Sequence, residues 1–297
     1  MAKGWRVLDC TAARGAIDAD RGLITIATAD GQVDRVPVDD LAILLLGTGF
    51  TITSGAMHRL AGYDAVVVLC DWAGNPKSVM TPWSSHSRIA QRQIAQAGLS
   101  PADRAETWGR LVRAKIVGQA ATLGTTKPRF ASRLEGMAQD VRPGDPNNTE
   151  GAAARFYWSH LWAKDFRRDT DGGDRINALL NYGYGILRGH GIRAVLGAGL
   201  IGAVGVAHSH RANPFNLVAD LMEPFRPAID FAVVHLPPYS SLKKVETKAL
   251  LAEACFNAFT PGGPSVAAEF ESLAQRFGRF AEGEADQLDV TAWRPNV

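Results

Sequence analysis

The chain has 297 residues, 46% of them hydrophobic and 21% charged, a balance typical of a globular protein that excludes disorder over most of its length. Its 32 basic and 30 acidic residues leave a net charge of +2, which indicates neither a nucleic-acid nor a membrane partner. Three widely spaced cysteines exclude a disulfide framework or zinc motif, and no apolar run forms a signal peptide or approaches the roughly 18 residues of a membrane helix, so we expect a cytoplasmic protein.

The first 75 residues are predicted to form a small β-rich domain. Apolar runs of strand length, separated by turn residues, lie at 5–9, 23–28, 41–46 and 65–70. One short helix is expected over 54–60. The runs at 41–46 and 65–70 carry more apolar surface than a domain of about 75 residues easily buries, which predicts that this domain buries part of it in a homodimer.

Residues 76–86 break the strand pattern and are predicted to be a linker. From residue 87 the apolar spacing becomes helical, and the predicted helices are 88–97, 102–123, 127–138, 151–164, 175–188, 243–257 and 270–281. The segment beyond them is acidic and is expected to be loose. The predicted fold class is therefore α+β, with a sandwich-like N-terminal β domain, residues 1–75, and a larger all-α C-terminal domain, residues 87–297.

Positive charge is concentrated at the start of the helical part. Between His86 and Arg142, ten Lys and Arg residues face only four Asp and Glu residues. Such an excess in a nearly neutral protein is what a polyanion-binding face requires. The alternative is a set of ordinary solvated helix faces.

A glycine-rich segment at 197–202, GAGLIG, fits the Gly-x-Gly-x-x-Gly fingerprint of dinucleotide-binding proteins. Asp220 follows at about the distance of a ribose-binding acid, so a nucleotide-binding oxidoreductase is one alternative function. The context argues against it, because a segment of helical period precedes the glycines and Asn213-Pro214 interrupts the expected crossover helix. We expect a helix C-terminus followed by a turn.

A group of acids and one histidine predicts a metal site. A helix expected over 215–226 places Asp220 and Glu223 three residues apart and hence on one face, His208 precedes it in a loop, and Glu150 opens another helix. Carboxylates with one imidazole suit Mg²⁺ or Mn²⁺ rather than structural zinc. Spacing alone leaves open the alternative that these are solvated acids at helix starts.

A polar stripe marks the helix predicted over 175–188. Asn177, Asn181 and Tyr184 fall on one helical face, where a core helix would be apolar. Buried amides need hydrogen-bond partners, so such a stripe lines a site or orients neighbouring polar groups. An exposed polar face is the alternative for each residue taken singly.

These segments also carry a family resemblance. The motifs EGAAARFYW, N-x-x-LNYGY, G-x-x-H and FNL-x-x-DLMEPFRP occur in this order between Glu150 and Pro227. In this combination the chain resembles the CRISPR-associated "Cas one" integrases, and their type II branch in particular, over essentially its whole length. The resemblance implies that Glu150, His208 and Glu223 are catalytic metal ligands for Mg²⁺ or Mn²⁺. Asp220 matches a further acid that binds the metal or supports the site, and His210 is a rival for the role of His208.

The resemblance also implies a function in antiviral defence. It predicts a metal-dependent DNA endonuclease and integrase that inserts captured spacer DNA into the CRISPR array by transesterification, without a covalent protein nucleophile. Expected partners are a second copy of the chain, a small "Cas two" dimer and double-stranded DNA, both spacer precursor and array, with no membrane. The phosphate-binding candidates are Arg88, Arg92, Lys115 and Arg129, and Asn177, Asn181 and Tyr184 are site-lining candidates. A non-catalytic nucleic-acid-binding assembly subunit is the other alternative.

Overall fold

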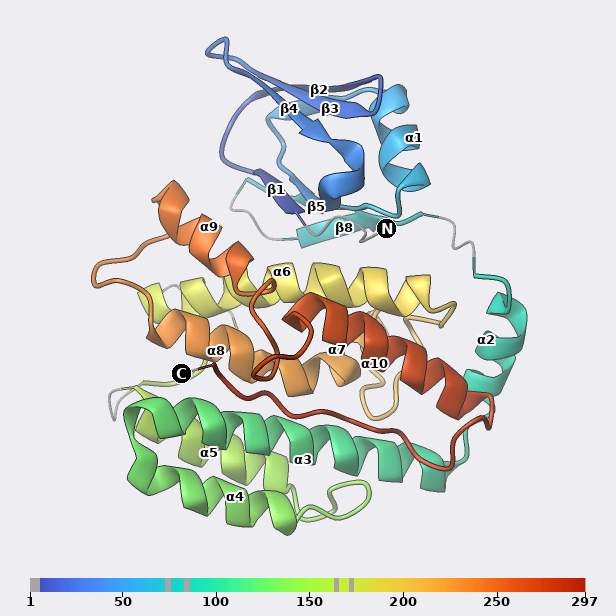
Figure 1. Ribbon diagram of the computed structural model, residues 1–297, viewed down its shortest axis with the longest axis vertical. Coiled ribbons are helices and arrows are strands. Elements are labelled where there is room, and N and C mark those ends of the chain that lie inside the picture. Colours follow the sequence, from blue (N-terminus) through green and yellow to red (C-terminus); the bar gives the residue numbers. More distant parts are fainter. Residues whose placement is uncertain (1–5, 73–75, 83–85, 163–165, 171–173, 297) are drawn as a thin grey trace. The chain divides into compact units, whose positions relative to one another are not determined.

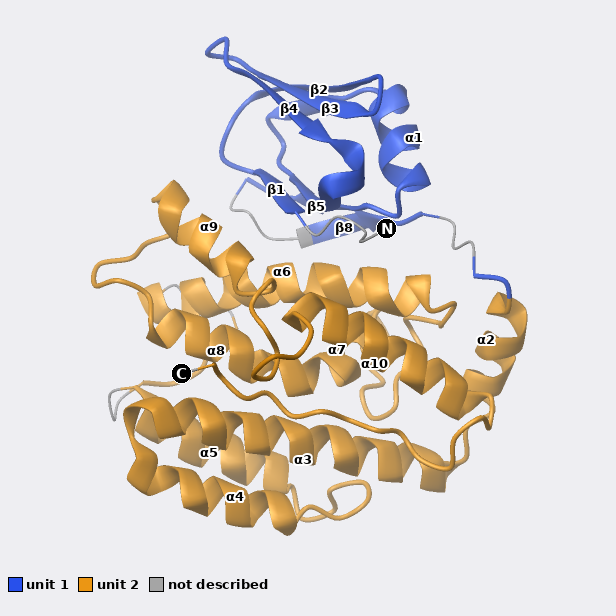
Figure 2. Ribbon diagram, viewed as in Figure 1, with its two compact units in different colours: residues 1–87 blue, residues 88–297 orange. Residues whose placement is uncertain are grey.

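A computed structural model of the chain describes residues 6–72, 76–82, 86–162, 166–170 and 174–296 (Figure 1). It divides into two compact units, residues 1–87 and 88–297 (Figure 2). Unit 1 contains the strands and one short α-helix, and unit 2 is helical, which confirms the predicted α+β class and the order of its two parts. None of the helices in the described part of the chain combines the length and apolarity that a bilayer crossing requires.

Unit 1 is built from two four-stranded sheets. The first has the order β1 (Arg6–Cys10), β5 (Leu41–Leu46), β7 (Val66–Cys70) and β8 (Pro76–Met80), with only the β7–β8 pair antiparallel. The second has the order β4 (Val33–Pro37), β3 (Leu23–Thr28), β2 (Gly15–Asp20) and β6 (Phe50–Ile52), with only the β2–β6 pair parallel. The short helix η1 (Val38–Asp40) leads into β5, and α1 (Ser54–Gly62) follows β6.

One expectation about unit 1 needs correction. The segment predicted to be a linker from residue 76 begins with β8, because Pro76–Met80 pairs with β7, so the β unit extends to residue 87; residues 83–85 lie outside the described residues. The homodimer stays a prediction. Leu41, Leu44 and Leu46 lie in a core with Ile17 and Leu60, so the unit itself covers much of the apolar surface that predicted a partner.

Unit 2 is a bundle of long and short helices that the periodicity largely predicts. Its elements are α2 (Ile89–Ala97), α3 (Pro101–Thr126), η2 (Pro128–Phe130), α4 (Ala131–Gln139), α5 (Thr149–Leu161), α6 (Arg175–Gly197), α7 (Asn216–Met222), η3 (Glu223–Phe225), α8 (Arg226–Val234), α9 (Val245–Glu253) and α10 (Val266–Ala281). Side-chain caps begin several of them: Ser100 accepts from the Asp103 amide at α3, and Ser265 accepts from the Ala268 amide at α10.

The glycine-rich segment is a helix end. Helix α6 continues through residue 197, Gly199 adopts a left-handed φ of 73°, and the Leu200 amide donates to the Val195 carbonyl. Residues 192–197 are therefore helix where a dinucleotide fold needs a strand. This agrees with the expected helix C-terminus and argues against the nucleotide-binding alternative.

The acidic C-terminal segment is not loose, contrary to expectation. The indole of Trp293 is buried against Phe231 and Phe259, with ring centroids 5.8 Å apart in both pairs. Glu282 is also buried, where Arg92 and Arg88 of the α2 region pair with its carboxylate. Apolar and charged contacts therefore fix the segment along the bundle, where it crosses close to α3 (Figure 1).

Candidate metal centre

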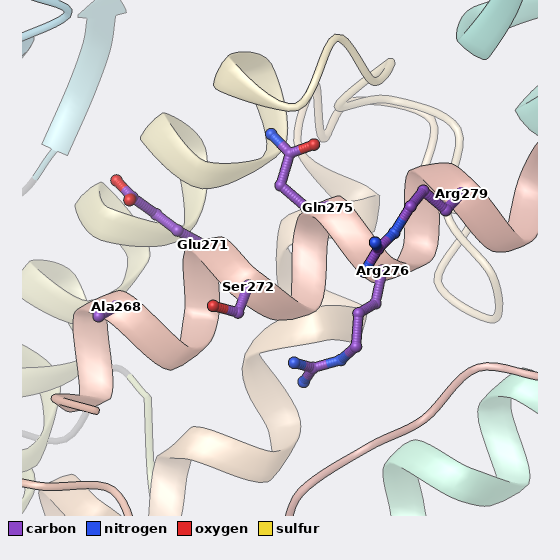
Figure 3. A pocket seen from close by; sticks show the side chains of 6 residues that line it. All are labelled: Ala268, Glu271, Ser272, Gln275, Arg276 and Arg279. Carbon is purple, nitrogen blue, oxygen red and sulfur yellow. The ribbon is translucent and has the colours of Figure 1, made fainter. Parts of the chain in front are cut away.

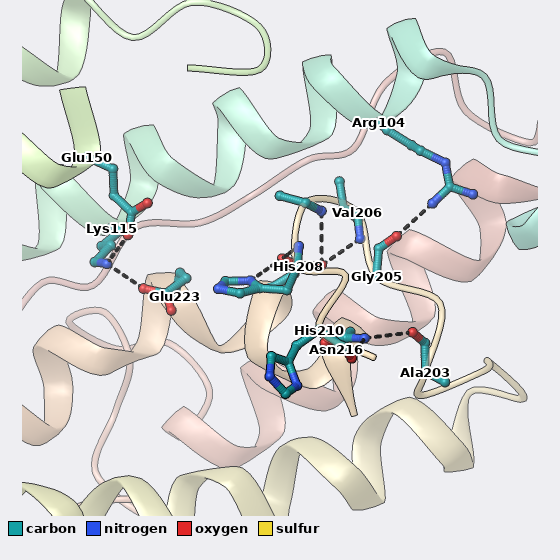
Figure 4. Close-up of polar contacts among 12 residues, drawn as sticks. Arg104, Lys115, Glu150, Ala203, Gly205, Val206, His208, His210, Asn216 and Glu223 are labelled. Carbon is teal, nitrogen blue, oxygen red and sulfur yellow. Dashed lines mark hydrogen bonds and ion pairs between the residues drawn. The ribbon is translucent and has the colours of Figure 1, made fainter. Parts of the chain in front are cut away.

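Two of the predicted ligands lie on either side of one ammonium group. Lys115 projects from α3, Glu150 from the first turn of α5 and Glu223 from the start of η3. The Nζ atom of Lys115 lies 2.5 Å from Oε1 of Glu150 and 2.5 Å from Oε2 of Glu223 (Figure 4). Carboxylates 73 positions apart in sequence therefore converge on a single cation.

The start of α5 is built to hold Glu150 in place. Asn148 adopts a left-handed conformation with φ of 50°, and its side chain caps the helix by accepting from the Gly151 amide. The Asp145 carboxylate accepts from the amides of Thr149 and Glu150, at 2.8 and 2.9 Å. The first helical turn also favours a negative side chain through the helix dipole.

Glu223 is buried yet ionised. Its Oε1 atom accepts from Nε of Arg226 at 2.7 Å, and Lys115 lies against its other oxygen. Burial alone would raise the pKa of Glu223, but the nearby charges of Arg226 and Lys115 outweigh it and lower the pKa to about 2. Pro224 follows directly, so the chain tightens into the 3-10 turn of η3 at this residue.

His208 is oriented by Asp220. The Asp220 side chain is fully buried and accepts from the amides of Val206, Ala207 and His208 and from Nδ1 of His208, the last at 2.6 Å. The imidazole therefore carries its hydrogen on Nδ1 in the neutral form, which leaves Nε2 as the nitrogen able to bind a metal. The hydrogen bond that His208 donates to Asp220 raises the pKa of His208 against the effect of burial, and the charges of Glu223 and Glu150 add to this rise.

Gly205 makes this arrangement possible. A Cβ atom there would lie 2.3 Å from the His208 carbonyl oxygen and 2.6 Å from Oδ2 of Asp220. Any side chain would therefore force the histidine loop away from the aspartate. The Gly-x-x-His spacing in the sequence thus has a steric cause.

His210 occupies a different place from His208. Figure 4 shows the His208 ring extending toward Glu223, while the His210 ring is directed away from the two glutamates. His210 Nδ1 accepts from the Ala212 amide, and its side chain is exposed. The geometry favours His208 over His210 beside the acids.

A second buried network lies behind Glu223. Asp230 of α8 is 1% exposed and accepts from the hydroxyls of Tyr157, at 3.0 Å, and Tyr184. Burial raises the pKa of Asp230 to about 6, although the two tyrosine hydrogen bonds oppose the rise. The guanidinium of Arg226 lies 4.9 Å from the Tyr184 ring centroid, so this network contacts the partner of Glu223.

The predicted polar stripe divides between two roles. Tyr184 belongs to the network with Asp230, whereas the amide oxygens of Asn177 and Asn181 accept from the guanidinium of Arg168, at 2.9 and 2.6 Å. Arg168 in turn lies 5.3 Å from the Tyr184 ring centroid. The two asparagines therefore orient a neighbouring arginine rather than contact the acids directly.

Sequence reasoning missed Lys115, Arg226 and Asp230 as parts of the site. The three-residue spacing of Glu223 and Arg226 is the one signal that pointed to a pair.

Three of the four phosphate-binding candidates pair with acidic residues of this chain. Arg92 is 5% exposed and donates to Glu282, Gln275 and the Ala198 carbonyl, so it is a structural arginine. Arg88 pairs with Glu282 and Glu284, and Lys115 pairs with the two site glutamates. Arg129 is exposed, 4.6 Å from the Phe130 ring centroid, and stays a candidate. The acids that neutralise Arg88 and Arg92 come from the C-terminal segment, which local charge counting ignores.

A cavity of about 590 Å³ lies on α10, away from the predicted ligands in sequence (Figure 3). Glu271, Gln275 and Arg276 are among its lining residues, and Glu271 pairs with Arg193 at 2.9 Å. None of the predicted site residues lines it.

The donor set at the acids suits a hard divalent cation. Two carboxylates hold a cation already, the Lys115 ammonium, and the Nε2 atom of His208 is the ligand that remains. Within the described ranges, no three His, Cys, Asp or Glu side chains are grouped closely enough to hold a metal ion, and the Lys115 ammonium lies between the two glutamates. Lys115 takes the position between the two carboxylates where a divalent cation would be held.

Comparisons with known proteins agree on one family. The family model described as CRISPR associated protein Cas1 matches residues 11–255. The chain is 33% identical over 216 residues to the CRISPR-associated endonuclease Cas1 of Neisseria meningitidis serogroup C (strain 8013), which covers 72% of this chain and 70% of that protein. Its fold is similar to a casposase bound to integration product, with a TM-score of 0.78 and 19% identity over 96% of this chain and 92% of that one. A Cas6-RT-Cas1–Cas2 complex matches with a TM-score of 0.77 and 19% identity, over 97% of this chain and 36% of that chain.

Proposed function

This chain belongs to the Cas1 family of CRISPR associated proteins, and from that membership we propose that it is a metal-dependent DNA endonuclease and integrase of CRISPR adaptation. The observation that carries the proposal is the convergence of Glu150 and Glu223 on one cation, beside a histidine whose ring is oriented by a buried aspartate. The order of the G-x-x-H motif and Glu223 supports the type II branch.

In the proposed reaction, the 3′-hydroxyl of a captured DNA attacks a phosphodiester of the CRISPR array. A new bond forms between that oxygen and phosphorus, the bond to the array strand's own 3′ oxygen breaks, and the released hydroxyl takes up a proton. One phosphodiester replaces another, so no external energy source is needed. The same site would cleave DNA when water replaces the attacking hydroxyl.

A divalent ion held by Glu150, Glu223 and Nε2 of His208 would supply positive charge at the attacked phosphate and at the reacting oxygen. The remaining groups of the site act on its ligands. Asp220 holds the tautomer and direction of His208, and Arg226 keeps Glu223 ionised and in place.

A covalent protein nucleophile is not needed, and the tyrosines are poorly suited to that role. The hydroxyl of Tyr184 is buried and donates to Asp230, and burial raises its pKa well above the ordinary value. A phenol in this state is a weak nucleophile. Tyr184 is therefore assigned to packing and positioning next to Arg226.

The proposed partners are a second copy of this chain, a small Cas2 dimer, and double-stranded DNA as spacer precursor and as array. The name of the Cas6-RT-Cas1–Cas2 complex, whose fold this chain shares, supports a Cas2 partner. Exposed cations such as Arg129 would contact phosphates, which contributes affinity rather than sequence recognition.

An integration assay tests the proposal. A supercoiled plasmid carrying a CRISPR array would be incubated with a short duplex, a Cas2 protein and Mn²⁺, with and without a chelator. We expect strand transfer that the chelator and Glu223→Gln both abolish, while Glu271→Gln, a matched change on α10, leaves it intact. Strand transfer by Glu223→Gln at the wild-type rate would contradict the assignment.

The second candidate function is a non-catalytic nucleic-acid-binding assembly subunit. It is favoured by the ion pairs of Lys115 and Arg226, which satisfy the site acids without any metal. In that case DNA binding would persist with no strand transfer or cleavage under any metal condition, and Mn²⁺ would not bind to the protein.

A further inference from the structure

We propose that Lys115 is a built-in competitor of the divalent ion: its ammonium group holds the cation position in the free protein and moves to Gln119 when the ion binds. The inference rests on the proposed function, because it concerns how the same site takes up its metal. It assigns to Lys115 the control of metal affinity, a role distinct from coordinating the ion.

Geometry makes the competition direct. The Nζ atom of Lys115 lies 2.5 Å from each of the two glutamates that would hold the ion. A divalent cation at ligand distance from both carboxylates would occupy nearly the same volume and repel the ammonium strongly in this buried place. One of the two cations must therefore leave.

The two cations of the site differ in their freedom to move. Arg226 is fixed on Glu223 by a 2.7 Å contact at Oε1 and packs against the Tyr184 ring. The ammonium group of Lys115 lies at the end of a flexible four-carbon side chain, which is 11% exposed. Lys115 is therefore the cation that is displaced, while Arg226 continues to neutralise the charge of Glu223.

A destination for the ammonium is present one helical turn away. Gln119 lies four residues after Lys115 on α3, so the two side chains share a face. Gln119 is 3% exposed, and its Oε1 atom is buried without a hydrogen-bond partner in the described part of the chain. A buried carbonyl oxygen without a donor is costly, and an ammonium group arriving there would remove that cost.

Metal affinity measured by calorimetry tests this without reference to activity. Wild-type protein and Lys115→Met would be titrated with Mn²⁺, and we expect the variant to bind at least about tenfold more tightly because the competing charge is gone. Lys127→Met, which removes one charge at the end of the same helix, is the matched control and should bind as the wild type does. Equal or weaker binding by Lys115→Met would overturn the inference.

Gln119→Leu tests the destination. It leaves the ion pairs intact and removes the unpartnered oxygen, so we expect roughly 3–10-fold weaker Mn²⁺ binding because the displaced ammonium loses its acceptor. In the Lys115→Met background the same change should have no effect. An equal loss in both backgrounds would contradict the movement to Gln119.

Lys115→Arg is a second variant, which tests the inference even if Lys115→Met does not fold. A guanidinium held by both carboxylates cannot withdraw as a lysine can, so this charge-preserving variant should bind Mn²⁺ about tenfold more weakly than the wild type. Equal or tighter binding would overturn the competition. Absence of Mn²⁺ binding in the wild type and all variants would contradict the proposed metal site together with this inference, whereas binding that Glu223→Gln abolishes but Lys115 variants do not change would contradict this inference alone.

Discussion

Replacing Asp220 with asparagine should uncouple the histidine loop from the bundle while keeping the shape of the side chain. In the wild type, Oδ2 of Asp220 accepts from the amides of Val206 and Ala207, and Oδ1 accepts from the amide and Nδ1 of His208. An asparagine has one oxygen and one NH₂ group. With the NH₂ group at the Oδ2 position, the amides of Val206 and Ala207 both lose their acceptor. With it at the Oδ1 position, the His208 amide loses its acceptor and the ring keeps its contact only in the other tautomer.

The size of the effect follows from that count. A buried donor without a partner costs about 1–3 kcal/mol, so the two donors lost in the first orientation predict a loss of about 3 kcal/mol of unfolding free energy. For a unit of this size that corresponds to a fall in melting temperature of roughly 6–12 °C. Because the aspartate also fixes the His208 tautomer, Mn²⁺ affinity should fall by roughly 10–100-fold.

Thermal denaturation followed by circular dichroism measures the first effect, and calorimetric titration with Mn²⁺ measures the second. Asp174→Asn is the matched control. Asp174 also accepts from two amides, those of Ile176 and Asn177, but it is an exposed helix cap where asparagine serves equally well. We expect that control to lie within about 0.5 kcal/mol of the wild type. An Asp220→Asn protein as stable as the control would refute the argument that these hydrogen bonds hold the loop.

Three further outcomes are expected. Gly205→Ala should lower stability and Mn²⁺ affinity together, because the new Cβ collides with backbone and carboxylate oxygens; a crystal structure with the loop unmoved would contradict this. Arg92→Met should lower the melting temperature by several degrees because it leaves Glu282 buried and partly unpaired, without changing the salt dependence of DNA binding. Arg129→Ala should instead reduce the slope of that salt dependence by about one unit, and gel shifts over a salt series distinguish the two variants. Burial raises the pKa of Asp230 to about 6, so the folded state binds the carboxyl proton more strongly than the unfolded state does. The stability that this protonation contributes is therefore greatest below pH 4 and is lost as pH rises through 6. The stability deficit of Asp230→Asn should therefore shrink by about 2 kcal/mol between pH 4 and 7 in urea unfolding curves, and a constant deficit would contradict the shift.

Local sequence signals predicted β1, β3, β5 and β7 of unit 1, but not β2, β4, β6 or β8. Helical spacing predicts the helices of unit 2, and the cap at Asn148 correctly precedes the helix that carries Glu150. The pattern also placed Glu150 in the first turn of its helix. Helix α8 was not predicted, and α6 was predicted too short because glycines weaken the helical signal without ending the helix.

Long-range pairing is what the sequence pattern could not supply. Lys115 and Arg92 belong to a basic stretch whose local acids are few, so both were expected to face a polyanion. Their actual counter-ions, Glu150, Glu223 and Glu282, lie 35, 108 and 190 positions further along the chain. No local window contains both partners of such a pair. The strand β8 was missed for a similar reason, because a segment that begins with proline forms a strand there by pairing with β7.

The closure of unit 2 by its own C-terminal segment has a consequence for the order of events during protein synthesis. Arg92, near the beginning of the unit, finds its carboxylate partner only at Glu282, and the pocket between Phe231 and Phe259 is filled by Trp293. A nascent chain that still lacks this segment exposes the rings of Phe231 and Phe259 and leaves Arg92 without its carboxylate partner. Residues 1–87 have by then already been synthesised. The helices of unit 2 would therefore reach their full packing only after this segment has been synthesised.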